Sequence, residues 1–106
     1  MATKDQLRAA FQSQGANMNG CCSEAAEPLA AECLGLTGRR QQIATRVGAW
    51  NALPESSPTF DPVAGLLHDS AARLAGAGND QQCSAAIASA HHAIDALEQL
   101  LDATAR

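Results

Sequence analysis

DQQCSAAIASAHHAIDALEQLLDAT, residues 80–104, is the stretch of the chain that decides its fold. Its apolar residues recur at alternating steps of four and three, which is the spacing of one face of an α-helix. At 1.5 Å per residue such a helix extends about 37 Å, so we expect it to be the central helix of a bundle. Its inward stripe consists of Cys83, Ile87, Ala90, Ile94, Leu97 and Leu101.

The helix that precedes this stretch is bounded by prolines and glycines. Residues 54–62, PESSPTFDP, contain three prolines, which lack a backbone donor, so we expect an internal linker that no helix crosses. We expect Asp61 to cap the next helix, with Pro62 in its first turn position. That helix should stop at Gly76 or Gly78, after which Asn79 or Asp80 caps the central helix.

The first half of the chain keeps one helical register over a long distance. It predicts a first helix from residue 3 to about residue 35, kinked near Pro28, with a break between Gly15 and Gly20 as the alternative. Gly35 and Gly38 should end this helix, and Thr37 should cap a further one. The further helix is expected to reach Leu53, with an inward stripe of Leu36, Ile43, Val47, Trp50 and Leu53.

Composition agrees with an all-helical fold. The 106 residues include 24 alanines, 16 leucines, isoleucines and valines together, and only 3 aromatic residues. Alanine is the best helix former, and the scarcity of β-branched residues argues against a sheet. We therefore predict one all-α domain over residues 1–106, a small four-helix bundle whose first helix is kinked or broken. No apolar run is long enough for a membrane span and the polar N-terminus lacks a signal-peptide core, so we expect a cytoplasmic monomer without membrane association.

The cysteines favour core packing over chemistry. No C-x-x-C pair occurs, so zinc-site spacing is absent, and we expect no cofactor. A cytoplasmic chain should keep its thiols reduced, and buried thiols then behave as small hydrophobic groups. The alternative is a soft-metal or redox site at the vicinal Cys21 and Cys22. In an exported protein, Cys22 would pair with Cys33 or with Cys83.

No residue pattern indicates catalysis. His68, His91 and His92 fall on or beside polar helix faces, so we interpret them as solvated. The chain lacks a Gly-rich phosphate loop, an H-E-x-x-H motif and a paired-carboxylate motif. We therefore expect a protein that is not an enzyme.

A local positive segment stands out in this acidic chain of net charge −4. Between Glu32 and Glu55 there is no acidic residue, but three arginines lie there, followed by the only tryptophan. Spacings of seven and four predict that two of the arginines and the tryptophan share one side of one helix. The plain interpretation is arginine stems covering a core tryptophan. The functional interpretation, which we carry forward, is a binding patch made of Arg39, Arg40, Arg46 and Trp50.

Acidic residues form strips on other predicted helices, the later strip being Asp95, Glu98 and Asp102. Such strips are usually solvated, but they can also imitate a phosphate backbone. The sequence thus leaves three hypotheses open. The first is a non-catalytic inhibitory binding protein, the second a helical bundle that handles metal or redox chemistry through its cysteines, and the third an immunity or antitoxin-like protein.

In size, acidity, helical pattern and lack of catalytic residues, the chain resembles the small phage-encoded anti-CRISPR proteins that inhibit type I systems. The resemblance is one of overall profile along the whole chain, without a shared motif. It implies stoichiometric blocking of target-DNA recognition or of nuclease recruitment by a CRISPR surveillance complex, through contact with a Cas subunit or with the single-stranded nucleic acid of that complex. It assigns no site residues.

Overall fold

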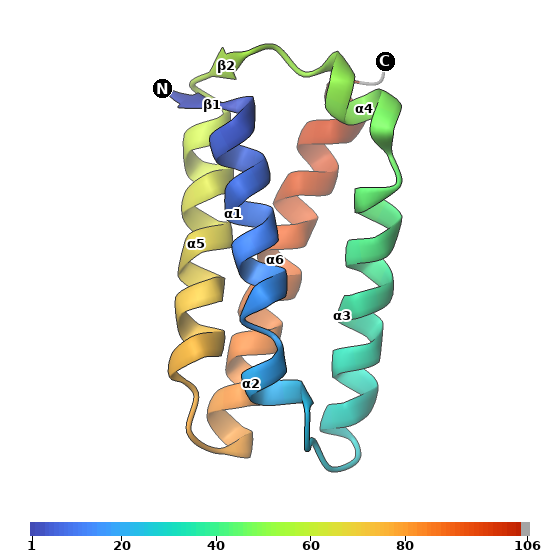
Figure 1. Ribbon diagram of the computed structural model, residues 1–106, viewed down its shortest axis with the longest axis vertical. Coiled ribbons are helices and arrows are strands. Elements are labelled where there is room, and N and C mark those ends of the chain that lie inside the picture. Colours follow the sequence, from blue (N-terminus) through green and yellow to red (C-terminus); the bar gives the residue numbers. More distant parts are fainter. Residues whose placement is uncertain (105–106) are drawn as a thin grey trace.

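The computed structural model describes residues 1–104, and its four long helices run along one common axis (Figure 1). Four of the helices are long, α2 and α4 are short, and two strands of two residues each pair antiparallel at one end. The elements are β1 (Ala2–Thr3), α1 (Lys4–Ala16), α2 (Asn19–Cys22), α3 (Leu29–Ala44), α4 (Val47–Ala52), β2 (Ser56–Ser57), α5 (Phe60–Gly76) and α6 (Asp80–Thr104).

Helix α6 has the bounds that its sequence predicts. The backbone N–H of Gln82 donates to Oδ1 of Asn79 at 2.8 Å, so Asn79 supplies the expected cap. Every residue of the predicted inward stripe is buried. Alanines at the core positions of α6 let neighbouring helices approach closely, which is how a chain with few large side chains still fills its interior.

The prediction of one kinked helix from residue 3 to about 35 is wrong, and its alternative, a break near Gly15–Gly20, is confirmed. Thr3 and Gln6 form a capping box that starts α1, which ends at Ala16. The side-chain amide of Asn17 donates to the Ser13 carbonyl at 2.9 Å and so satisfies a helix-end acceptor. Pro28 lies at the N-cap of α3, where its missing N–H costs nothing, and not inside a helix.

The predicted helix end at Gly35 and Gly38 is also wrong. Helix α3 continues through both glycines to Ala44, because the buried Leu29, Cys33, Leu36 and Ile43 anchor one face along its whole length and outweigh the roughly 1 kcal/mol that each glycine costs. Thr37 is not a cap, since its hydroxyl donates to the Cys33 carbonyl one turn earlier at 2.9 Å. The residues after α3 form the separate helix α4, on which Val47 is 60% exposed and not inward as predicted.

Helix α5 begins at Phe60 and ends at Gly76, one of its two predicted ends. Thr59 takes the N-cap position that we expected of Asp61, so the helix starts inside the segment predicted as a linker. Leu53 and Phe60 are buried and fix both sides of this connection. The segment from α4 through β2 crosses one end of the molecule and joins α3 to α5 (Figure 1).

The long helices pack side by side in the order α1, α5, α6, α3. The backbones of α3 and α1, at the two ends of this order, pack less closely than those of the other neighbouring helices. An all-α fold is thus confirmed, while α2, α4 and the two-strand ribbon are additions to the predicted four-helix arrangement. None of the helices in residues 1–104 combines the length and apolar character needed to cross a membrane.

Candidate functional site

Two residues of the predicted patch, Arg39 and Arg46, form ion pairs within the molecule, on the seam between α3 and α6. Arg39 contacts the carboxylates of Asp95 at 2.5 Å and Glu98 at 2.8 Å. Arg46 contacts Asp102 at 2.8 Å. The later acidic strip therefore neutralises these two arginines, and ion pairs of this partly exposed kind contribute at most about 1 kcal/mol each.

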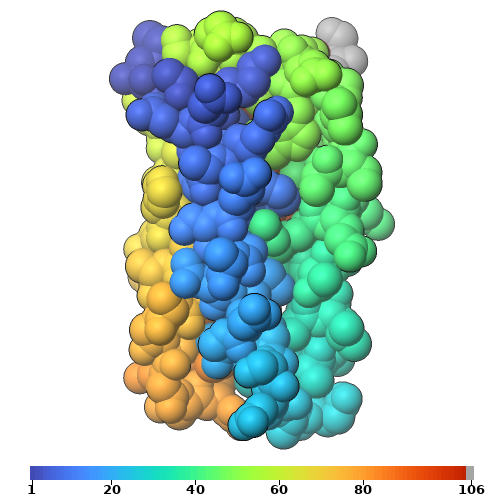
Figure 2. All heavy atoms as spheres, viewed as in Figure 1, coloured from blue at the N-terminus to red at the C-terminus, as the bar shows by residue number. Residues whose placement is uncertain are grey.

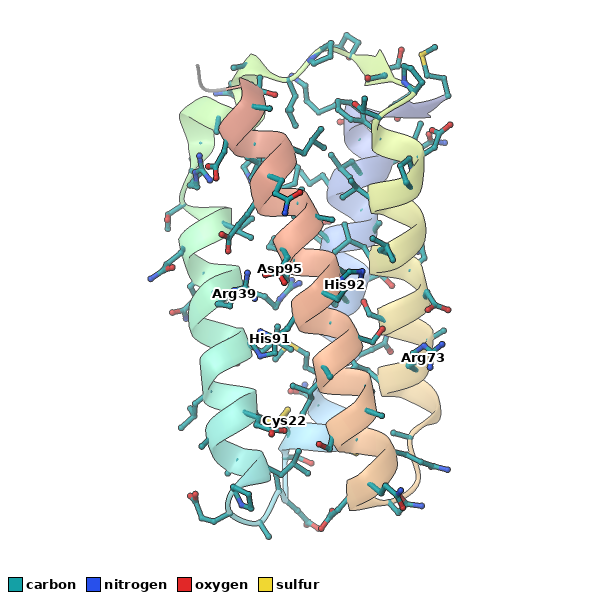
Figure 3. All side chains as sticks on the ribbon, turned by 180° about the vertical axis from the view of Figure 1, so that it is seen from behind. Cys22, Arg39, Arg73, His91, His92 and Asp95 are labelled. Atoms are coloured by element: carbon teal, nitrogen blue, oxygen red, sulfur yellow. A yellow bond between two sulfur atoms is a disulfide. The ribbon has the colours of Figure 1, made fainter. Side chains whose placement is uncertain are left out.

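The environment of Arg39 also includes His91, which we had interpreted as solvated. Arg39 Nη1 lies 3.1 Å from His91 Nδ1, and the imidazole is half-buried (Figure 3). Partial burial acts to lower the pKa of Arg39, but the hydrogen bonds that Arg39 donates to the carboxylates of Glu98 and Asp95 outweigh it and raise that pKa above its ordinary value. His91 is thus part of the α3–α6 seam, whereas His92 is exposed.

Arg40, the neighbour of Arg39, points the opposite way, toward α1. Its guanidinium donates to the Phe11 carbonyl at 2.8 Å and to Oε1 of Gln14, and it lies 4.0 Å from the centre of the Phe11 ring. Gln14 is fully buried and donates in turn to Ser70 Oγ at 2.9 Å and to the Ala90 carbonyl at 3.3 Å. This network joins all four long helices. Burial lowers the pKa of Arg40 to about 10, so Arg40 is still a cation at pH 7.

Trp50 lies on α4 and not on the same helix as the arginines, so the predicted common face of one helix is wrong. The side chain is 4% exposed, and its Nε1 donates to the Ile43 carbonyl at 3.0 Å. Its ring packs at 5.8 Å from the ring of Phe11. On the outer side, the guanidinium of Arg8 on α1 lies 5.3 Å from the centre of the tryptophan ring.

These residues line a groove along the seam between α1 and α3, which we call the α1–α3 groove. Figure 2 shows this face of the molecule, with α1 running between α5 and α3. Two hollows of about 350 Å³ and 360 Å³ make up the groove. The hollow beside α4 is lined by Arg8, Phe11, Gln12, Ala44, Val47, Trp50 and Asn51. The hollow beside α2 is lined by Phe11, Gly15, Met18, Asn19, Thr37, Arg40, Gln41 and Ala44.

The α1–α3 groove is positive and free of acidic residues. Neither Arg8 nor Arg40 has a carboxylate within ion-pair distance in the part of the chain that the structure describes. Lys4 lies beside the groove, since its Nζ donates at 3.3 Å to the carbonyl of Asn51, which lines the hollow beside α4. The structure thus brings Arg40 and Trp50 together with two cations that our sequence analysis missed, while Arg39 and Arg46 lie elsewhere. Arg8 could have been found from its spacing, one turn before Phe11.

The cysteines gather at the α2 end of the molecule, and one pair is bonded. Cys22 on α2 and Cys33 on α3 form a disulfide, with Cα atoms 5.9 Å apart (Figure 3). The expectation of four reduced thiols is therefore wrong, and the pairing is one of the two considered for an exported protein. Cys21 and Cys83 are free and buried, and Cys21 Sγ lies 3.7 Å from the Leu74 carbonyl. Among residues 1–104, no group of three or more cysteine, histidine or acidic side chains is arranged to hold a metal ion.

We predict that the two free thiols are unreactive in the folded protein. Burial, followed by a hydrogen bond with Cys83, raises the pKa of Cys21 to about 12, so almost none of it is the nucleophilic thiolate at pH 8. Titration with a chromogenic thiol reagent at pH 8 should find no reactive thiol before denaturation and two after it. A fast-reacting thiol in the native protein would contradict this and would favour the redox hypothesis.

Comparisons with protein-family models, with curated proteins and with solved structures yield no match to this chain. The functional argument therefore depends on the geometry of the α1–α3 groove.

Proposed function

We propose that the protein is a non-catalytic inhibitory binding protein and that the α1–α3 groove is its binding surface. The observation that carries the proposal is the separation of charge. The cations without a carboxylate partner in residues 1–104, Lys4, Arg8 and Arg40, meet at one groove, while the molecule as a whole is negative. Arginine and tryptophan are also the residues that contribute most to protein interfaces.

The specific target that we propose follows from the resemblance in overall profile. As an anti-CRISPR protein, the chain would occupy a Cas subunit, or the nucleic acid held by a type I surveillance complex, and prevent DNA recognition or nuclease recruitment. Nothing in this mode of action needs a cofactor or turnover. The inhibitor would act stoichiometrically, as a monomer in the cytoplasm of the phage's host.

We predict that reversing charge in the groove abolishes inhibition. Plating of a CRISPR-targeted phage would be measured on cells that produce the wild-type protein, Arg8→Glu, or the matched control Arg73→Glu. Arg73 lies on α5, outside the groove, and its only carboxylate partner in the described residues is the exposed Asp69 at 3.1 Å, so its reversal makes the same change in net charge at little cost to stability. We expect the wild type and the control to restore plaques and Arg8→Glu to restore none, because Arg8→Glu should bind its target at least about tenfold more weakly, which is 1.4 kcal/mol.

Arg8 is the preferred position because its side chain forms no hydrogen bond or ion pair within residues 1–104 and its replacement leaves the network around Gln14 intact. Reversal of Arg39 or Arg46 would instead place a glutamate beside Asp95, Glu98 or Asp102 and weaken the α3–α6 seam through like-charge repulsion. Full inhibition by Arg8→Glu would exclude the groove as the binding surface. A wild-type protein that does not restore plaques would exclude the anti-CRISPR target.

A cytoplasmic site of action adds a condition on the disulfide. The cytoplasm keeps thiols reduced, so inhibition there must not require the bond between Cys22 and Cys33. We therefore predict that the double variant Cys22→Ser/Cys33→Ser restores plaques as the wild type does. Loss of inhibition by a double variant that is still folded, as judged by its circular dichroism, would argue for an oxidising compartment.

A further inference from the structure

The aromatic rings of the α1–α3 groove are not available for base stacking. Phe11 is 6% exposed and Trp50 is 4% exposed. Guanidinium groups lie over both rings, Arg40 at 4.0 Å from the centre of Phe11 and Arg8 at 5.3 Å from the centre of Trp50. Proteins that hold single-stranded nucleic acid stack successive bases on free aromatic faces. The groove therefore exposes cations at the positions where a surface for single-stranded nucleic acid would expose aromatic rings.

The cations of the groove lack the carboxylate partners that the other described cations have. Arg39, Arg46 and Arg73 each pair with carboxylates from this chain, whereas Lys4, Arg8 and Arg40 pair with none in residues 1–104. Arg40 is partly buried, and burial lowers its pKa to about 10. A carboxylate brought into the groove from outside would offset this desolvation, because a partly buried ion pair is screened less than an exposed one.

The shape of the groove matches a helix. Its walls are two antiparallel helices, and along α1 it extends from Arg8 to Gly15, roughly 10 Å at 1.5 Å per residue, before it continues to the start of α2. Most of its exposed lining is apolar, and Val47 at its edge is 60% exposed. An amphipathic helix binds such a groove through apolar residues at steps of three and four.

We infer that the occupant of the α1–α3 groove is an acidic amphipathic helix of a partner protein, whose carboxylates pair with Arg8 and Arg40. This inference rests on the proposed function and narrows its target to a protein segment. Carboxylates one or two helical turns apart on the partner would reach arginines that lie on opposite sides of Phe11. The apolar residues between them would cover Val47 and Ala44.

The test uses Trp50 as a reporter, since it is the only tryptophan of the chain and lies in the groove wall. The probe is a blocked helical peptide of about 18 residues with leucines on one face and glutamates one and two turns apart beside them, and it contains no tryptophan. Its matched control has glutamine in place of each glutamate. A second probe is oligo(dT) of 15 nucleotides. Tryptophan emission would be followed at low and at physiological salt.

We expect the glutamate peptide to change the Trp50 emission in a saturable way, and the glutamine peptide to bind at least about tenfold more weakly. Arg8→Gln should weaken binding of the glutamate peptide by a similar factor, and Arg73→Gln should not. Binding of oligo(dT) with Arg8 dependence, in place of the peptide, would overturn the acidic-helix inference while leaving the groove as the functional surface. Binding of neither probe would overturn the inference as well.

A second copy of this chain is the remaining occupant of the groove to exclude. Size-exclusion chromatography with light scattering should give a monomer for the wild type and for Arg8→Gln at the concentrations of the binding experiment. A wild-type dimer that Arg8→Gln dissociates would assign the groove to a second copy of this chain and overturn the inference. The plaque assay with Arg8→Glu remains an independent test of the proposed function, since it needs no knowledge of which probe binds.

Discussion

Leu97→Ala is expected to lower the free energy of unfolding by about 2–5 kcal/mol. Leu97 is fully buried on α6, a helix whose other buried positions include Ala86, Ala90 and Ala93, and such small side chains cannot move to fill a cavity. In a chain with only 16 leucines, isoleucines and valines, each large side chain carries an unusual share of the buried area. Urea denaturation monitored by circular dichroism would measure the loss.

The matched control is Gln99→Ala, two residues further along α6 and exposed. Its effect should stay within about 0.5 kcal/mol, which is usual for surface substitutions. If Leu97→Ala fell within the same range, the packing of α6 described above would be wrong.

Reduction of the Cys22–Cys33 disulfide is expected to lower the free energy of unfolding by about 3 kcal/mol. The bond closes a loop with a sequence separation of 11 residues, and a covalent loop of that length limits the conformations of the unfolded chain. It also ties the four-residue α2 to α3 at a place where glycine and proline interrupt the helices. The measurement compares urea midpoints of the wild type with and without reductant.

The double variant Cys22→Ser/Cys33→Ser serves as the control for this comparison. Reductant should leave its midpoint unchanged, because the buried Cys21 and Cys83 form no disulfide. Any packing lost on replacing Cys33 affects the variant alone and does not enter the wild-type comparison. A wild-type midpoint that reductant does not move would contradict this prediction and would agree with the reduced thiols that our sequence analysis expected.

The sequence predicts α6 and the end of α5 correctly because the signals there are local and agree with one another. A regular apolar stripe, a cap at Asn79 and a stop at Gly76 all indicate the same bounds. In the first half the local signals conflict. Gly35 and Gly38 argue for a helix end, but burial of Leu36 and Ile43 against the rest of the core keeps α3 helical through both.

The candidate site was predicted in part, and its missing half comes from another element. The acid-free stretch drew attention to Arg40 and Trp50, both of which line the groove. The sequence could not show that adjacent arginines would point to opposite sides, Arg39 to the carboxylates of α6 and Arg40 to α1. Nor could it place Arg8 over a tryptophan 42 positions away.

The sequence by itself determined the helical class, the central helix and the presence of one basic segment in an otherwise acidic chain. Each of these depends on residues close together in the chain, through periodicity, capping and charge spacing. Only the tertiary structure decided which cations are neutralised, which cysteines are bonded and where the groove lies. Those outcomes depend on which helix faces meet, and that choice is made by burial of the whole core at once, because no segment can bury its apolar face alone.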